Sequence, residues 1–322
     1  MTLTQLRYLV AIADSGLNIT LAAQRVHATQ PGLSKQLKQL EDELGFQLFL
    51  RKGRSLESVT PSGAEVIARA RKVLLESGNI RALAANLRGE KQGELAVATT
   101  HTQARYVLPK AIGGLKRRFP DVGVHIVPGG EGDALAELGR GADVAIVSTS
   151  GSPPTGGIAV PLYTWQRVAL APRGHALAKL RRAPTLAELA REPLVSYDSS
   201  LKSDSSLRQA FSDAGLTPRI ALTAGDADLI KTYVRTGLGI GILAEMAVQA
   251  SDETDLVQLP ADEHFAGCIA WAVLPRERVP RDYTLALLTL LAPQLDARDL
   301  RRALEGTFEG NWPSPPAWQR RD

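Results

Sequence analysis

The stretch that decides the fold of this chain runs from Thr20 to Arg54 and reads TLAAQRVHATQPGLSKQLKQLEDELGFQLFLRKGR. A short helix that Asn18 can cap is followed by a turn at His27 to Thr29. A second helix then starts abruptly at Pro31, because proline has no amide hydrogen to lose in a first helical turn and its φ is already fixed. The apolar residues that recur in this helix at spacings of three and four are Leu33, Leu37, Leu40 and Leu44. One face of the helix is therefore expected to be buried.

The opposite face of the second helix carries hydrogen-bonding side chains and no acid until its far end. Such side chains reach base edges and phosphates in the major groove of DNA. Two short strands around Lys52 and Gly53 are expected to follow, with basic side chains at their tip for phosphate or minor-groove contact. A lone pattern of two helices is more often an ordinary helical hairpin, but the basic strands favour a winged helix-turn-helix DNA reader over residues 1–60. The residues predicted to contact DNA are Thr29, Gln30, Ser34, Lys35, Lys38, Arg51, Lys52 and Arg54.

Charge is distributed unevenly along the 322 residues. Residues 1–88 carry 12 lysines and arginines against 7 acidic residues, whereas residues 89–322 carry 26 against 27. This is the expected footprint of a polyanion-binding module joined to a neutral one. The single cysteine, Cys268, excludes a disulfide framework and a cysteine zinc site. We find no signal-peptide pattern and no apolar run of about 18 residues, so we expect a cytoplasmic protein without membrane contact.

A long helix is predicted from Pro61, which Thr60 can cap, to about Leu87. The residues that follow an alternating four-three spacing along it are Val66, Ala70, Val73, Ser77, Ile80, Ala84 and Leu87. Sustained over three heptads, this spacing favours a seam against the same helix of a second chain. The alternative is a helix packed on its own domain. We interpret residues 61–88 as a linker and dimerisation helix.

From Glu94 the pattern changes to alternating strands and helices, which predicts an α/β fold with parallel sheets. The segment TQARYVLPKAIGGLKRRFP is expected to form one helix after the first strand, ELAVATT. A second unit of the same kind is expected between about Leu162 and Ala266, with strands RVALAP, PLVSY, RIALTA and GIGIL. A strand, CIAWAVLP, and a helix near Arg281 to Ala292 come late. The tail of residues 306–322 is rich in proline, glycine and charge, and is expected to be disordered.

Hydrogen-bonding residues gather at TTHTQARY, residues 99–106, where the first strand of this region gives way to a helix. Amides at a helix start, flanked by the hydroxyls of Thr99, Thr100 and Thr102 and the amide of Gln103, form a receptor for a small anion. The simpler alternative is that the threonines cap the helix. Ligands bind at the carboxyl ends of strands in open α/β sheets, and Ser148 and Thr149 end a further strand of the same sheet.

Several motifs of enzymes and metal proteins are absent from the sequence. The glycines of residues 237–243 do not follow the dinucleotide-binding spacing, and the five histidines show no metal-ligand spacing. Neither a nucleophile elbow nor a phosphate-binding loop is present. The acidic pair in residues 226–228 is better explained as a helix cap than as a metal pair. We therefore predict no catalytic residues, no metal and no cofactor other than a small-molecule effector.

The N-terminal motifs resemble those of the LysR-type transcriptional regulators. They are LRYLVAIADSG, AAQRVHATQPGLSKQLKQLEDELGFQLFLR and VTPSG. Further along, ATTHTQARYVLP and AGLTPRIALTAGDADLIKTYVRTGLGIGIL are similar to the CysB-like subgroup, the activators of cysteine regulons. The resemblance implies a two-lobed, periplasmic-binding-protein-like effector domain over residues 89–305. Its first lobe would comprise residues 93–161 and 267–305, and its second lobe residues 162–266.

The resemblance also implies a function: ligand-responsive control of sulfur assimilation, cysteine biosynthesis or sulfonate-use genes. Implied partners are double-stranded promoter DNA, RNA polymerase and further copies of the chain, as a dimer that extends to a tetramer. Alternatives are a LysR-type regulator of an unrelated pathway, or a solute-binding protein or enzyme of the same two-lobed fold, because fold does not fix function. The N-terminal 60 residues favour the regulator.

In that subgroup an acetylated serine, sulfate or thiosulfate occupies the cleft between the lobes. The residues expected to line it are Thr99, Thr100, Thr102, Gln103, Ser148, Thr149, Trp165 and Lys202. Lys202 departs from the pattern, because the subgroup usually has a threonine there. An ammonium group would favour a more anionic ligand, such as sulfate, a sulfonate or adenylyl sulfate. The alternative is that Lys202 is a solvated loop lysine.

Overall fold

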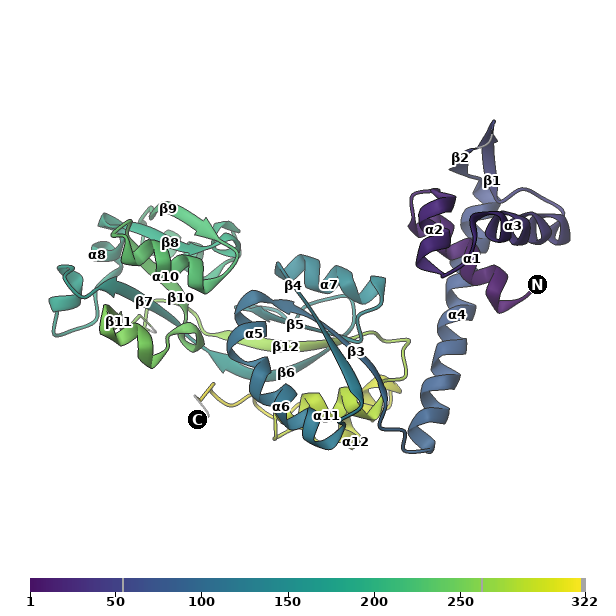
Figure 1. Cartoon of the computed structure of the whole chain (residues 1–322). Helices are drawn as coiled ribbons and strands as arrows, with labels where there is room; N and C mark the ends of the chain where they lie inside the picture. Colours follow the sequence, from purple (N-terminus) through teal and green to yellow (C-terminus); the bar gives the residue numbers. More distant parts are fainter. Residues whose placement is uncertain (54, 262, 320–322) are drawn as a thin grey trace. The chain divides into compact units, whose positions relative to one another are not determined.

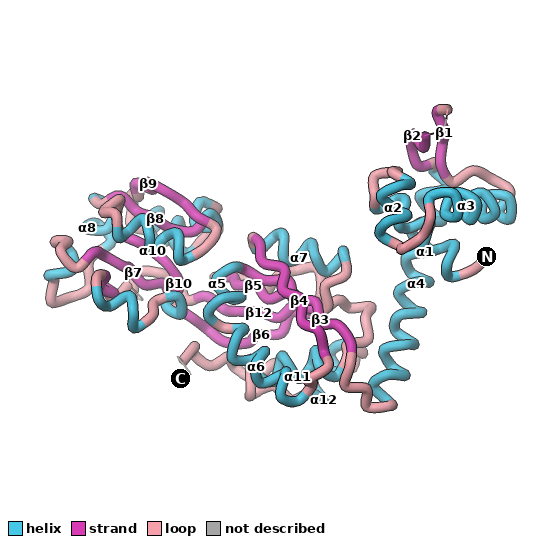
Figure 2. Tube along the Cα trace, in the orientation of Figure 1, coloured by secondary structure: helices cyan, strands magenta, loops and turns pink. Residues whose placement is uncertain are grey.

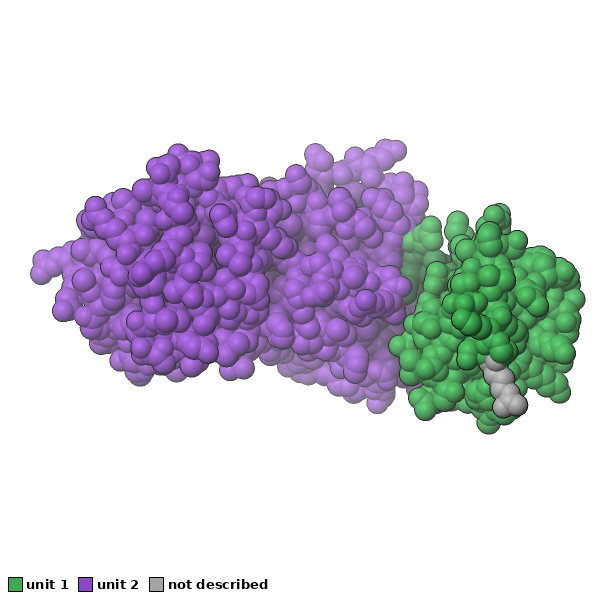
Figure 3. All heavy atoms as spheres, turned by 90° about the horizontal axis from the view of Figure 1, so that it is seen from above, with its two compact units in different colours: residues 1–88, 277–279 green, residues 89–276, 280–322 purple. Residues whose placement is uncertain are grey.

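The computed structural model describes residues 1–53, 55–261 and 263–319. Arg54, expected at the wing tip, lies outside the described residues. The chain forms two compact units, residues 1–88 with 277–279 and residues 89–276 with 280–322 (Figure 3). No helix within the described residues combines the length and apolar character that a membrane crossing requires.

The first unit is a winged helix-turn-helix, as predicted (Figure 1). Its elements are α1 (Leu3–Asp14), α2 (Ile19–Arg25), α3 (Gln30–Leu44), β1 (Phe49–Lys52), β2 (Ser55–Val59) and α4 (Pro61–Leu87). The Asn18 Oδ1 accepts the Leu21 amide at 3.0 Å and so caps α2. His27 has a left-handed φ of 51°, which makes the tight turn before α3. Leu33, Leu37 and Leu40 are buried in a core shared with α1 and the start of α4, so the predicted buried face is confirmed.

A buried carboxylate fastens the antiparallel strands of the wing to α3. Glu41 is 7% exposed, and its Oε1 accepts the Leu48 amide at 2.9 Å. Its Oε2 pairs with the Arg51 guanidinium at 3.0 Å. Glu41, in the acidic last turn of α3, therefore fixes where the wing begins.

The second unit begins with a mixed five-stranded sheet in the order β4-β3-β5-β12-β6. The strands are β3 (Gly93–Thr100), β4 (Val122–Gly129), β5 (Val144–Thr149), β6 (Ile158–Trp165) and β12 (Cys268–Leu274). The helices are α5 (His101–Tyr106), α6 (Leu108–Arg118), α7 (Glu131–Arg140), α11 (Asp282–Leu291) and α12 (Ala297–Leu304). Figure 2 shows α7 on one side of the strands and α6 and α11 on the other, and each side has its own apolar core. We call this sheet and its helices the first lobe.

A second sheet, in the order β11-β7-β10-β8-β9, forms the second lobe. Its strands are β7 (Arg167–Pro172), β8 (Pro193–Tyr197), β9 (Arg219–Ala224), β10 (Ile240–Ala244) and β11 (Leu256–Leu259). Its helices are α8 (Leu186–Arg191), α9 (Ser206–Asp213) and α10 (Ala227–Arg235), with 3-10 turns η1 (Leu177–Lys179), η2 (Asp198–Leu201), η3 (Glu245–Ala247) and η4 (Ala250–Thr254). The chain passes from β6 into this lobe and returns to the first lobe at β12, which lies antiparallel between β5 and β6.

Two expectations about this unit are corrected. The segment expected to be one helix forms two, because Pro109 cannot supply an amide to an earlier turn and the chain restarts at Leu108. The lobe boundary, expected after residue 161, lies at Gln166 between β6 and β7. Trp165 still pairs with Cys268 of β12, so residues 162–165 belong to the first sheet.

The tail also differs from the expectation of disorder. The Thr164 amide donates to the Pro316 carbonyl at 2.9 Å, and the Trp318 amide donates to the Thr164 carbonyl at 2.7 Å. Trp312 and Trp318 pack on the apolar core of the first lobe. Burial of large aromatic side chains outweighs the polar composition of this segment, which is placed as far as residue 319.

Candidate functional site

A cavity of about 880 Å³ lies between the two lobes of the second unit. It opens at the carboxyl ends of β3 and β5, where the sequence predicts a ligand site. The predicted residues that line it are Thr100, Thr102, Gln103, Ser148, Thr149, Trp165 and Lys202. The lining is hydroxyl-rich, so it can donate several hydrogen bonds to a small oxygen-bearing ligand.

Thr99 was also predicted to bind the ligand but does not line this cavity. Its side chain is fully buried, and its Oγ1 donates to the Ile146 carbonyl at 2.8 Å. Successive side chains of a strand point to opposite faces, so Thr99 and Thr100 cannot both face the ligand. The role of Thr99 is to hold β3 against β5.

A chain of buried hydrogen bonds orders one wall of the cavity. The Tyr163 hydroxyl donates to Gln103 Oε1, and the side-chain Nε2 of Gln103 donates to Ser148 Oγ at 3.4 Å. The Trp165 indole nitrogen also donates to Ser148 Oγ, at 3.1 Å. Burial raises the pKa of the Tyr163 phenol, which keeps it protonated as a donor. Because Ser148 already accepts two hydrogen bonds, its own hydroxyl hydrogen can point to a ligand.

The threonines on the same side are held in a comparable way. Thr149 Oγ1 accepts the Trp271 indole N–H at 2.9 Å. Thr100 Oγ1 accepts the backbone N–H of Gln103 at 3.4 Å and so caps α5. Each hydroxyl keeps its hydrogen for another acceptor. The helix α5 has only six residues. We therefore attribute the polarity of this wall to the side chains more than to a helix dipole.

Two pairs of residues join the lobes across the cavity. Thr102 Oγ1 lies 3.3 Å from the Tyr197 hydroxyl, and Lys202 Nζ lies 3.4 Å from Glu131 Oε2. Burial raises the pKa of the Glu131 carboxyl, and the neighbouring ammonium opposes this shift. The positive charge predicted to attract an anion at Lys202 is thus already offset by a carboxylate from the first lobe.

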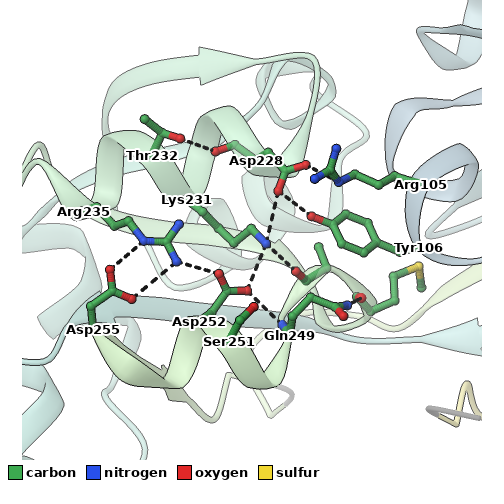
Figure 4. A network of polar contacts seen from close by, with 12 residues as sticks. Arg105, Tyr106, Asp228, Lys231, Thr232, Arg235, Gln249, Ser251, Asp252 and Asp255 are labelled. Atoms are coloured by element: carbon green, nitrogen blue, oxygen red, sulfur yellow. Dashed lines mark hydrogen bonds and ion pairs between the residues drawn. The ribbon is translucent and has the colours of Figure 1, made fainter. Parts of the chain in front are cut away.

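A larger polar network joins the lobes through α5 and α10 (Figure 4). The Asp228 carboxylate accepts the Tyr106 hydroxyl at 2.7 Å and pairs with the Arg105 guanidinium at 2.6 Å. Lys231 pairs with Asp228 at 3.3 Å and with Asp252 at 2.9 Å. Burial lowers the pKa of Lys231, but its hydrogen bonds with Tyr106 and Asp252 outweigh this effect and raise it above its usual value. The α5 helix therefore carries both cavity-lining residues and charged contacts to the other lobe.

Sequence reasoning missed four acidic residues of the lining and one buried cation, Arg167. It begins β7, its side chain is only 6% exposed, and its Nε donates to Ser206 Oγ at 2.7 Å. Reading RVALAP as a strand gave no reason to single out its first residue. An arginine at the start of an otherwise apolar, buried strand was the available signal.

The surface predicted to read DNA lies on α3 and the wing. Gln30, Lys35 and Lys38 are exposed, and Ser34 is half-buried. Thr29 Oγ1 accepts the Gly32 amide at 3.3 Å and caps the helix. These residues keep one face of α3 polar and accessible, opposite the buried leucines.

On the wing the two described basic residues differ. The Lys52 side chain is 83% exposed and makes only a long, exposed ion pair with Glu57 at 4.0 Å, so it suits a phosphate contact. Arg51, predicted to contact phosphate, is instead paired with the buried Glu41 at 3.0 Å. We therefore interpret Arg51 first as a wing support, because breaking this pair would leave Glu41 buried without its partner.

Replacing Lys38 with alanine is expected to weaken binding to all DNA sequences alike, because we expect this exposed lysine to contact phosphate and not base. The slope of log affinity against log salt should fall by roughly one unit. Fluorescence anisotropy over a series of salt concentrations measures both effects. Lys110→Ala, in the other unit, is the control. If Lys38→Ala leaves affinity and slope unchanged, a different face of α3 meets the DNA.

Comparison with known proteins matches this chain in both units. The family model described as bacterial regulatory helix-turn-helix protein, lysR family, matches residues 3–64, and the LysR substrate binding domain matches residues 88–296. The HTH-type transcriptional regulator CysB of Haemophilus influenzae is 39% identical over 94% of each chain. The regulator SsuR of Burkholderia cenocepacia is 36% identical over 93% of this chain and 97% of that one. The solved cofactor-binding domain of the Cbl transcriptional regulator superposes with a TM-score of 0.61 at 34% identity, over 67% of this chain and 94% of that one.

Proposed function

The chain belongs to the LysR family of bacterial transcriptional regulators, and we propose that it controls genes of sulfur assimilation, cysteine biosynthesis or sulfonate use. As a member of that family it is a regulator and not an enzyme. The observation that carries the proposal is the hydroxyl-lined cavity of about 880 Å³ between the lobes, a volume suited to a small effector. The similarity to CysB, SsuR and Cbl supports a sulfur-linked effector.

The proposed partner of the first unit is double-stranded promoter DNA, met by α3 in the major groove and by the wing beside it. Assembly would proceed through α4 to a dimer and from there to a tetramer. Such a regulator acts in the cytoplasm, where it would also meet RNA polymerase. The match to the lysR helix-turn-helix model and the exposed polar face of α3 support DNA as the partner of the first unit.

The proposed signal is a change in how the two lobes approach one another. A ligand that contacts Thr100 and Gln103 on the first lobe and Tyr197 on the second can make all these contacts only when the lobes are close. Such a ligand therefore favours the closed cavity. Closure would alter the spacing of DNA-binding units within the tetramer. A tenfold change in promoter occupancy requires a difference of about 1.4 kcal/mol in ligand affinity between the two states.

The test is a pair of substitutions in the cavity, Thr102→Ala and Gln103→Ala. Both variants should bind promoter DNA as the wild type does but lose the response to effector. Losing a hydrogen bond to a charged ligand costs about 1.5–3 kcal/mol, which is at least tenfold in the concentration required. Deoxyribonuclease footprints, with and without acetylserine or sulfate, measure both properties.

Thr289→Ala is the matched control. Thr289 lies on α11 of the first lobe, does not line the cavity, and donates its hydroxyl to the Ala286 carbonyl of the same helix. This variant should respond to effector like the wild type. A wild-type response in both Thr102→Ala and Gln103→Ala would place the sensor site elsewhere in the chain.

A further inference from the structure

The guanidinium of Arg167 is buried at the cavity and forms no ion pair with a carboxylate of the described residues. Its side chain is 6% exposed, and its Nη1 has no hydrogen-bond partner among the described residues. The Arg167 charge acts on the Glu131 carboxyl and lowers its pKa, against the larger opposing effect of burial, but Glu131 forms its ion pair with Lys202. Arginine stays charged when buried, and an unpaired buried charge costs several kcal/mol. This arrangement destabilises the unliganded protein and would be relieved by a bound anion.

The surroundings hold this guanidinium in place. Its carbon lies 5.8 Å from the centre of the Trp165 ring, and its Nε is bonded to Ser206. Trp165 in turn donates to Ser148, whose hydroxyl lines the same cavity. Arg167 is thus preorganised beside hydroxyl donors, and its planar fork suits two parallel hydrogen bonds to an oxyanion.

The other charges of the cavity limit the charge of the ligand. Lys202, the one lysine of the described lining, is paired with Glu131. The remaining acidic residues of the described lining are Asp133, Asp198 and Asp204. A dianion such as sulfate would face these three carboxylates with one uncompensated positive charge to bind it. A single negative charge on an otherwise neutral or ammonium-bearing molecule is matched by that one guanidinium.

We propose that Arg167 binds the acid group of the effector, and that the effector is a small monoanionic acid, a sulfonate or carboxylate, and not sulfate. The inference rests on the proposed function, because it concerns the same cavity. It differs from the expectation that Lys202 selects the anion.

Calorimetry on the full chain tests the proposal with four probes: N-acetylserine, its uncharged amide, ethanesulfonate and inorganic sulfate. The wild type should bind at least one of the two monoanions about tenfold more tightly than sulfate or the amide. Arg167→Gln should weaken binding of that monoanion about thirtyfold. Arg167→Lys keeps the charge but not the planar guanidinium, so its affinity should lie between those of the wild type and Arg167→Gln. The proposal would be overturned if sulfate bound as tightly as the monoanions, or if neither monoanion bound. It would also be overturned if Arg167→Gln changed the affinity for the monoanion less than twofold.

A thermal melt separates ligand binding from a structural role. Because the Arg167 charge has no ion-pair partner among the described residues, the Arg167→Met variant without ligand should have a Tm at or above that of the wild type. The variant should also lose the rise in Tm that the monoanion gives to the wild type. A lower Tm without ligand would show that Arg167 is structural and would overturn the proposal. The footprint test with Thr102→Ala is independent: if that variant loses its response while Arg167→Gln binds normally, the regulatory function stands and this inference fails.

Discussion

Replacing Gly63 with alanine is expected to destabilise the first unit and weaken DNA binding, while effector binding by the second unit persists. Gly63 lies in the first turn of α4, and a Cβ there would lie 2.0 Å from the Leu48 carbonyl oxygen. That oxygen cannot move aside, because it accepts the Thr60 amide at 3.0 Å and the Thr60 hydroxyl at 3.2 Å. Overpacking of this kind costs about 1–3 kcal/mol, and a backbone contact this short lies at the upper end. Urea unfolding followed by circular dichroism, with anisotropy of labelled DNA, measures the loss.

Gly78→Ala is the matched control, since it places the same methyl group in the same helix. No described atom lies within 4 Å of a Cβ at Gly78. Alanine should therefore stabilise α4 by about 0.5–1 kcal/mol through its better helix propensity, and DNA binding should be retained. If Gly63→Ala unfolds at the same urea concentration as the wild type, the junction of α4 with the wing is not as close as described.

Local patterns predicted the elements of this chain well. The caps at Asn18 and Thr60, the leucine spacing of α3 and the helix from Pro61 to Leu87 all depend on residues within one or two turns of each other. The strands of the second unit were found for a similar reason, because buried strands are short apolar runs between turns. Resemblance to a family supplied what local patterns could not, namely the return of β12 to the first sheet.

The partners of the charged residues at the candidate sites could not be predicted from local patterns. Arg51 pairs with Glu41 ten residues away, and Lys202 pairs with Glu131 across the cavity. Such partners depend on tertiary placement, so a sequence pattern shows the charge but not what offsets it. Thr99 lies outside the cavity because successive side chains of a strand point to opposite faces, and local patterns do not show which face meets the ligand. Arg167 was missed because its burial, and the lack of a hydrogen-bond partner for its Nη1 among the described residues, depend on tertiary packing.

The largest effect on assembly is expected from a charge in the exposed apolar row of α4. Of the residues in this four-three row, Val73 is 44% exposed, Ile80 63% and Leu87 80% in the single chain. Large aliphatic side chains in one row along a helix favour burial against a second helix, and their four-three spacing suits a coiled coil with another copy. Ile80→Asp would place a carboxylate in that seam at a cost of several kcal/mol. We expect the dimer to dissociate and the affinity for a two-site promoter to fall at least about a hundredfold.

Sedimentation velocity over a range of concentrations would measure the assembly directly. Arg81→Asp provides the control, because it adds a carboxylate at the adjacent exposed position, outside the four-three row. That variant should remain a dimer, and Ile80→Leu should as well. The monomeric Ile80→Asp chain should still bind effector, since the cavity is built within one chain. If both Ile80→Asp and Val73→Asp sediment as the wild type does, the seam along α4 does not hold the copies together, and assembly must rest on the second unit.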